Sequence, residues 1–318
     1  MALEKIATKR KHSKLIELAI RMWKEKPLGT IGAVIILILL ITAIFAPLLA
    51  PYGLNEMLPD ALHAPSAKYL LGTDNLGRDI LSRIIWGARI SVTVGLVATL
   101  ISTTTSTIMG VLSAYIGGTV DLIMQRFVDA VLCIPSLIIL IVIISIIGPG
   151  LWQVIICLGV ANGIAGTRMI RSLVIGIKEN MYMQSAVALG SPTRKILLQH
   201  VLPNIMAPII ILFSMSVPSM ILSESTLSFL GYGVPPPTPS WGGMLSGSAR
   251  TYMFKAPWMA FWPGLALSII VYGINMFGDA VRDLLDPRLR GGVGRYGGQI
   301  KRKNALTKKS SAPEQSIK

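Results

Sequence analysis

The chain has 318 residues, of which 52% are hydrophobic and only 14% are charged, whereas a soluble domain carries about a quarter charged residues. Its long apolar runs exclude an ordinary soluble enzyme. The formal net charge of +15 lies beside those runs, as is typical of a membrane protein that meets anionic lipid headgroups, and we expect no nucleic-acid partner.

Six apolar stretches are long enough to cross a bilayer core, which takes about 20 residues per helix. In chain order they are 28–50, 90–117, 128–147, 151–172, 204–229 and 258–280. Backbone groups in hydrocarbon must pair within their own segment, so each stretch is predicted to be an α-helix. The expected fold is an all-α polytopic membrane protein with six transmembrane helices.

The distribution of Lys and Arg predicts the orientation in the membrane. Most of the 30 basic residues fall in segments 1–27, 118–127, 168–203 and 279–318, which share one side if the helices alternate in direction. Basic segments stay inside, so both termini are expected in the cytoplasm. The first apolar run lacks a clear small-x-small cleavage site and is interpreted as a retained helix, not a signal peptide.

Chemistry-bearing residues are scarce in the predicted spans. The acids Asp121, Asp129, Glu179, Glu224 and Asp279 fall at or near span ends. A carrier driven by protons or sodium usually keeps ionisable residues inside its helices. Motifs such as GxxxxGK[ST], HExxH and GxSxG are missing, and the two cysteines suggest neither a disulfide nor a metal site. We therefore expect no catalytic, cofactor-binding or metal residue in this chain.

Several polar features near the span ends have simple structural interpretations. The hydroxyl-rich stretch 99–110 either packs helices closely, which we favour, or forms a polar wall facing a solute pathway. The stretch 71–79, LGTDNLGRD, predicts a helix start capped by Thr73 or Asp74. Arg168 and Arg171 are interpreted as topology anchors. Glu224 is interpreted as a hydrogen-bonding partner between helices.

A polar segment, MYMQSAVALGSPTRKILLQHVLPN at 181–204, separates two of the apolar runs. Residues 182–189 are expected to be helical up to Gly190, and Ser191-Pro192 predicts a helix restart with Ser as N-cap and Pro at the first helical position. The second helix is expected to end near Leu202, because Pro203 predicts a break. The element is either an amphipathic connector or a docking site for a cytoplasmic protein.

The spacing Gln184-Ser185-Ala186-x3-Gly190, with Leu202-Pro203 twelve residues later, resembles the EAA motif of ABC importer permeases. Gln184 stands where Glu is usual, and Ser185 where Ala is usual. The resemblance implies a coupling helix that sits in a groove of an ATPase subunit. The residues it assigns to this loop are Gln184, Ser185, Ala186, Gly190, Ser191, Pro192, Arg194, Lys195, Leu202 and Pro203.

Four further stretches resemble one subgroup, the C-type permease subunit of dipeptide, oligopeptide and nickel importers. They are APLLAPYG (46–53), LGTDNLGRDILSRIIWGARIS (71–91), ESTLSFLGYGVPPPTPSWGGML (224–245) and NMFGDAVRDLLDPRLR (275–290). The resemblance covers roughly 20–290 and implies a type I importer permease fold. The implied organisation is a basic segment 1–27, a first helix and outer segment 28–89, a permease core 90–290 and a basic, disordered tail 291–318.

The same resemblance implies a role and a set of partners. The chain would form half of a pathway for di- or oligopeptides in a prokaryotic cytoplasmic membrane, paired with a homologous B-type permease. Two ABC ATPase subunits would carry ATP and Mg, and an extracytoplasmic solute-binding protein would deliver the solute. Nickel or another small solute remains an alternative cargo, and a secondary carrier or channel is disfavoured.

The outer loop 231–257 is rich in Pro, Gly and aromatic residues. Two interpretations of it stay open. It is either a receptor-facing surface, with Pro235, Pro236, Pro237 and Trp241 as its candidate residues, or a rigid lid over the helix ends.

Overall fold

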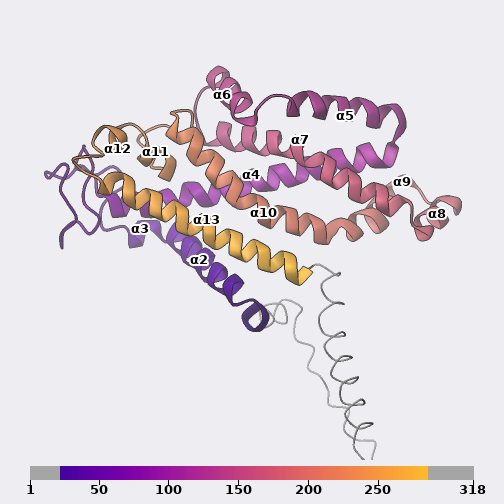
Figure 1. Cartoon of the computed structure of the whole chain (residues 1–318), viewed down its shortest axis with the longest axis horizontal. Helices are drawn as coiled ribbons and strands as arrows, with labels where there is room; N and C mark the ends of the chain where they lie inside the picture. The colour runs from indigo at the N-terminus through magenta and orange to yellow at the C-terminus, as the bar shows by residue number, and fades with distance from the viewer. Residues whose placement is uncertain (1–21, 286–318) are drawn as a thin grey trace, which may run out of the picture.

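The computed structural model of the protein describes residues 22–285, which form an elongated bundle of long helices with short helices at both ends (Figure 1). The elements are α2 (Pro27–Ile44), α3 (Ala46–Leu49), α4 (Ile80–Ile116), α5 (Gly118–Leu132), α6 (Ser136–Ile147), α7 (Leu151–Lys178), α8 (Met181–Ala188), α9 (Thr193–Ile196), the π-helical turn η1 (Leu197–Val201), α10 (Leu202–Phe229), α11 (Trp241–Leu245), α12 (Ser248–Thr251) and α13 (Trp258–Leu285). Within the described residues, β pairing is limited to one isolated bridge between Thr73 and Asp79.

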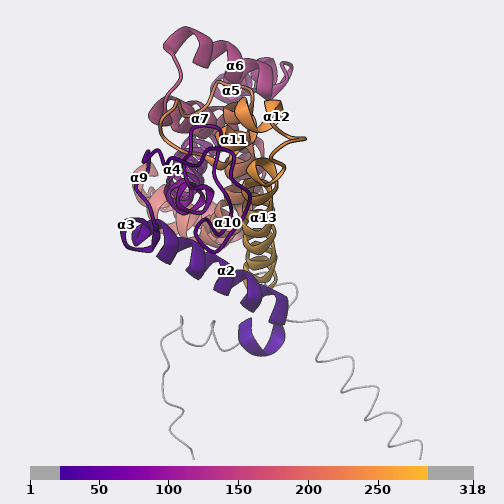
Figure 2. The same ribbon diagram turned by 90° about the vertical axis from the view of Figure 1, so that its left-hand side faces the viewer.

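Five helical segments are long and apolar enough to cross a membrane, and the bent pair α5–α6 makes a sixth if it counts as one span. The five are α2, α4, α7, α13 and the segment Thr193–Phe229. In the end-on view, α2 and the α5–α6 pair lie on opposite sides of the bundle (Figure 2). The all-helical, polytopic fold expected from hydropathy is confirmed.

The third predicted span is not the single straight helix expected over 128–147. The chain leaves helix after Leu132 and restarts at Ser136, and the two helices meet at 87°. Pro135 is the cause, because it lacks a backbone N–H and disfavours a helical conformation at Ile134. The bent pair carries the chain from the end of α4 at Ile116 back along the bundle to the start of α7 at Leu151 (Figure 1).

The helix of the second span begins ten residues earlier than the predicted start at 90. Helix α4 starts at Ile80 with Asp79 as N-cap, and the Asp79 carboxylate accepts a hydrogen bond from the Ser82 N–H at 2.8 Å. The expected caps, Thr73 and Asp74, were therefore also wrong. Arginines in the first turns of α4 lower the mean hydropathy there, so hydropathy places the start of the span too late. One of them, Arg89, donates from Nε to the Ala43 carbonyl at 2.8 Å.

The core centres on the contact between α4 and α7, where small residues let the backbones approach closely. A Cβ on Gly110 would lie 2.7 Å from Ile170, and one on Gly163 would lie 2.6 Å from Thr105. Ser106 donates its hydroxyl to the Gly163 carbonyl at 2.8 Å. The packing interpretation of stretch 99–110 is confirmed for this face of α4.

The beginning of α2 and the end of α13 meet at one end of the bundle. Lys26 pairs with Asp283 at 2.5 Å, and a Cβ on Gly29 would overlap the side chain of Ala280. In Figure 1 these two helix ends lie toward, but short of, the tip formed by α8 and α9, and this side of the bundle, opposite α11 and α12, is called the inner end below. Residues 1–21 of the basic N-terminal segment, and the tail 291–318, lie outside the described residues.

Candidate functional site

The EAA-like loop forms a helical hairpin, α8–α9, at the inner tip of the molecule. Gly190 follows α8 with a φ of +71°, a left-handed conformation that favours glycine. The Gly190 N–H donates to the Val187 carbonyl at 2.9 Å, and the Ser191 N–H donates to the Ala186 carbonyl at 3.1 Å. These two bonds are the glycine C-cap of a helix. The helix–Gly–helix prediction is therefore confirmed.

The restart after the glycine differs by one residue from the prediction. Pro192 is the N-cap, with φ −65° and ψ 143°, and α9 begins at Thr193. Ser191 was expected to be the N-cap with Pro192 at the first helical position, and both assignments were wrong. The reason is that the Ser191 N–H closes the end of α8, so this residue belongs to the first helix and not the second.

The break predicted at Pro203 is also absent, because α9, η1 and α10 run as one helical segment, Thr193–Phe229. The Leu202 N–H donates to the Leu197 carbonyl five residues back, which widens the helix by one π turn. This turn lies directly before Pro203, where the proline ring needs extra room. The 37 residues make a rod of about 55 Å, which reaches from the inner tip to the outer end.

One face of the hairpin is anchored in the bundle. Met183, Ala186 and Ile196 are buried and pack in a cluster with Ile170 and Val174 of α7. The hairpin is also linked across its own turn, since the rings of Tyr182 and His200 lie 6.4 Å apart. The hairpin is therefore fixed by packing to α7.

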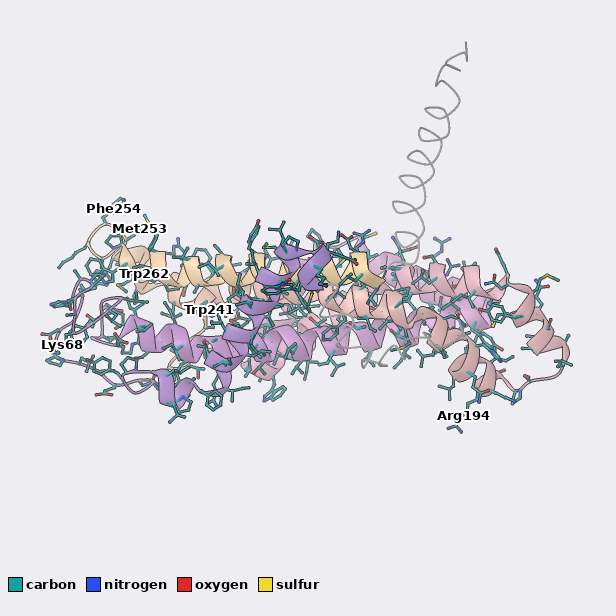
Figure 3. The ribbon with its side chains drawn as sticks, turned by 90° about the horizontal axis from the view of Figure 1, so that it is seen from below. Lys68, Arg194, Trp241, Met253, Phe254 and Trp262 are labelled. Carbon is teal, nitrogen blue, oxygen red and sulfur yellow. The ribbon has the colours of Figure 1, made fainter. Side chains whose placement is uncertain are left out.

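The opposite face is exposed and mixes apolar with basic side chains. Met181 and Leu189 are each 84% exposed and Val187 is 58% exposed. Arg194 projects away from the bundle at this tip (Figure 3). The other exposed motif residues are Gln184, Ser185, Gly190, Pro192, Lys195 and Pro203, whereas Ser191 and Leu202 are half-buried. An exposed apolar surface rimmed by polar groups is typical of a protein-docking site.

The two departures from the EAA pattern both lie on this outward face. Gln184 donates from Nε2 to the Glu179 carbonyl at 3.4 Å, and Ser185 donates to the Met181 carbonyl at 2.9 Å. Both bonds stay within or beside α8. The hairpin folds without the usual Glu and Ala because the two side chains do not take part in its anchoring.

An ion-pair network braces the hairpin's base. Arg171 of α7 binds both carboxylate oxygens of Asp121 in α5, at 2.7 and 2.6 Å, and Ser113 of α4 donates to the same carboxylate. Arg168 of α7 pairs with one carboxylate oxygen of Asp129 in α5. The arginines were predicted only as topology anchors. Their partners lie 50 and 39 residues away, where no local sequence pattern indicates a pairing.

At the outer end, Trp241 is buried, with only 2% of its surface exposed. Its indole N–H donates to the Ile84 carbonyl at 3.1 Å, and the ring lies over Gly87, where a Cβ would come within 2.9 Å. Figure 3 shows it among the helices, whereas the exposed Phe254 lies at the edge of the same end. Trp241 was therefore wrong as a receptor-facing residue. Its burial is what holds the loop over the helix ends as a lid.

Next to Trp241, the outer loop exposes three prolines and covers a buried glutamate. Pro235, Pro236 and Pro237 are exposed on top of the lid. Below them, Glu224 is fully buried and accepts hydrogen bonds from Ser228 at 2.6 Å and Ser225 at 3.4 Å. Both of these serines lie on α10, but the side chain of Ser240, the N-cap of α11, also hydrogen-bonds to Glu224, so Glu224 links two helices as the sequence had suggested.

Comparison with known proteins agrees with this architecture. Residues 106–291 match the family described as binding-protein-dependent transport system inner membrane component. The chain belongs to this family. Residues 14–65 also match the N-terminal transmembrane domain of oligopeptide transport permease C. The protein is thus a multi-pass inner membrane permease subunit of an ABC importer.

Similar proteins cover nearly the whole length. The dipeptide transport system permease protein of Alkalihalophilus pseudofirmus is 38% identical over 86% of this chain and 90% of its own. The dipeptide permease of Haemophilus influenzae is 39% identical over 84% and 93%. Among solved structures, a chain of the MetNI methionine ABC transporter, in inward-facing conformations, aligns with a TM-score of 0.50 at 18% identity, covering 64% of this chain and 96% of that one. This last likeness concerns the fold alone.

Proposed function

We propose that this permease is the C-type subunit of a peptide importer and forms half of the pathway for di- or oligopeptides. The supporting observation is its 36–39% identity, over more than four-fifths of the chain, to permeases named for dipeptide and oligopeptide transport. A homologous B-type permease supplies the other half of the pathway. The chain itself is non-catalytic, and ATP and Mg bind to partner ATPase subunits.

The α8–α9 hairpin is the part of this chain that docks onto an ATPase. Its exposed tip, with Met181, Val187 and Leu189 beside two basic residues, offers the surface, and its buried face offers a firm anchor. When ATP closes the ATPase pair, the tip is displaced. The continuous segment Thr193–Phe229 carries this displacement along the bundle to the outer lid.

The lid faces the opposite compartment, where an extracytoplasmic solute-binding protein docks. The exposed prolines 235–237 give it a stiff outer surface, because proline fixes the backbone torsion φ and loses little conformational freedom on binding. The segment is held from below by the buried Trp241. Membrane lipids surround the apolar helices between the two docking surfaces.

One second cargo has a specific observation in its favour. The glutathione transport system permease protein of Escherichia coli is 35% identical over 85% of this chain, so a small peptide with an unusual linkage is the alternative. Nickel is a further candidate implied by the subgroup. Each cargo reaches the permease through a binding protein, which sets most of the specificity.

Reconstitution of the complete transporter in proteoliposomes tests the proposal. Uptake of a radiolabelled dipeptide, a pentapeptide, glutathione and Ni²⁺ is measured with and without ATP on the side of the membrane that carries the ATPase subunits. We expect uptake of the peptides that requires ATP, both ATPases and the binding protein. Uptake of Ni²⁺ alone, or uptake by this chain without ATPases, would contradict the proposal.

A further inference from the structure

The outer end holds a cavity of about 470 Å³ beneath the lid, at the opposite end from the α8–α9 hairpin. Its walls come from the turn before α4, the first turn of α4, the outer end of α10, and the segments around α11 and α12. The volume is in the range of small-molecule sites, which run from about 300 to 1,000 Å³. The cavity therefore has room for a whole small solute.

The polar groups of this cavity are unequally satisfied. Asp74 is fully engaged, since it accepts hydrogen bonds from the Leu76 N–H at 2.8 Å and from Arg78, through its N–H at 2.9 Å and its Nε at 2.6 Å. Arg83 differs, because its Nε lies 3.9 Å from the Asp74 carboxylate and, within residues 22–285, its NH1 has no hydrogen-bond partner.

Arg83 is 7% exposed, and its NH1 group has no hydrogen-bond partner among residues 22–285. Leaving a buried charged donor unpaired costs free energy. The Asn75 side-chain oxygen lines the same cavity and is likewise without a partner among the described residues. One cationic side chain and one neutral side chain in the wall of the same cavity thus each have a polar atom without a partner among the described residues.

These features define the chemistry of an occupant. A carboxylate suits Arg83, because a guanidinium binds carboxylates with charge-assisted hydrogen bonds. An N–H donor suits Asn75. The remaining wall includes the apolar side chains of Val234, Met244 and Met259, which accommodate a small hydrophobic group. A short peptide with a free C-terminal carboxylate has all three features.

We propose that this cavity is an outer binding site for a short peptide, whose carboxylate pairs with Arg83 and whose N–H donates to Asn75. The proposal rests on the proposed peptide-import function and adds a site within this subunit. Its position beneath the lid is where a solute arrives when the binding protein opens above the prolines. The site holds the peptide by its terminus, so it accepts many side chains.

Equilibrium binding of a radiolabelled dipeptide, alanyl-phenylalanine, to the complete permease–ATPase complex without binding protein tests the site. The comparison ligand is the same dipeptide with a C-terminal amide. We expect the free acid to bind at least tenfold more tightly than the amide. Equal binding of the two by the wild-type complex would overturn the proposal.

Variants locate the effect. Arg83→Gln is expected to remove the acid-over-amide preference, whereas Arg250→Gln, an equal loss of charge on the exposed face of α12, keeps it. An assembled Arg83→Gln complex that retains the preference would contradict the assignment. If Arg83→Gln does not assemble, Asn75→Asp decides, since a carboxylate in the wall of the same cavity should repel the free acid and abolish the preference, and persistence of the preference overturns the site.

Two outcomes separate this site from the proposed function. ATP-dependent peptide uptake with no acid-over-amide preference in binding would refute the site and leave the importer assignment standing. A complex that transports no peptide would refute the importer assignment itself. An Arg83→Gln variant that only weakens binding-protein affinity would show that the carboxylate comes from that protein, which also refutes the site.

Discussion

Arg171 of α7 donates two hydrogen bonds, of 2.7 and 2.6 Å, to the two carboxylate oxygens of Asp121 in α5. The two side chains are 31% and 19% exposed, and Ser113 of α4 donates to the same carboxylate. Three helices are therefore joined at the inner end of the bundle, immediately beside the helices that carry the α8–α9 hairpin. This brace holds α5, the first helix of the bent α5–α6 pair, against α4 and α7.

Removal of the brace should lower stability. Arg171→Gln leaves Asp121 partly buried without its cation, and we expect a coupling free energy of about 1–2 kcal/mol in a double-mutant cycle with Asp121→Asn. Arg126→Gln is the matched control, since Arg126 is 76% exposed and 3.6 Å from its partner. Thermal unfolding of the purified complex measures the effect. An unchanged melting temperature for Arg171→Gln would refute the bracing role.

Glu224 should stabilise the top of α10 through its serine contacts. Glu224→Ala leaves the Ser228 hydroxyl without its 2.6 Å acceptor in a buried position, at a cost of about 1–3 kcal/mol. Glu224→Gln retains an acceptor and is expected to lose less than half as much. Thermal unfolding of the two variants makes the comparison. Equal losses would mean that the charge, and not the hydrogen bond, matters.

Hydropathy predicts the helical segments well and their ends less well. The start of the last span at Trp258 and the outer end of α10 at Phe229 agree with the prediction. The first ten residues of α4 were missed because Arg89 and the charged residues before it lower the mean hydropathy of this stretch. In the structure Arg89 is accommodated by a hydrogen bond to the Ala43 carbonyl, which hydropathy cannot predict. The bend between α5 and α6 at Pro135 lies inside an apolar run, and a hydropathy average over that run does not reveal it.

In the candidate site, too, local features were predictable from the sequence and features set by tertiary contacts were not. The glycine cap at Gly190 is a local feature and was predictable from residue types alone. The π turn before Pro203 depends on how the helix widens in three dimensions, and a proline rule predicts a break there. The exposure of Leu189 and the burial of Trp241 depend on which neighbours cover them. Sequence patterns contain no information on those neighbours.

Gly190 is expected to be needed for its backbone conformation. A Cβ at this position meets nothing within 4 Å, and φ is +71°, so strain arises from the torsion and not from crowding in this chain. Asn tolerates this region and a β-branched residue does not. Gly190→Val should therefore reduce transport-linked ATPase activity about tenfold, and Gly190→Asn should retain most of it.

Co-purification with the ATPase subunits checks that both Gly190 variants still assemble. Normal coupling in Gly190→Val would contradict a role for the cap. Loss of coupling in both variants would instead place the requirement at the partner's surface, where any Cβ collides with the docked ATPase.

Gln184→Glu should preserve assembly and uptake. The side chain points outward, and its contact is a 3.4 Å bond to the Glu179 carbonyl. A carboxylate near the start of α8 also interacts favourably with the helix dipole. Uptake by the reconstituted transporter is expected to equal or exceed that of the wild type. A fall of more than twofold would mean that the partner ATPase is matched to a neutral residue here.

The most direct measurement is photo-crosslinking from the hairpin tip in the assembled transporter. Benzoylphenylalanine replaces Leu189, which is 84% exposed at the inner tip, or Phe254, which is 96% exposed at the outer end. We predict crosslinks to an ATPase subunit from position 189 and none from position 254. Absence of an ATPase crosslink at 189, or the same crosslink from 254, would contradict docking at α8–α9.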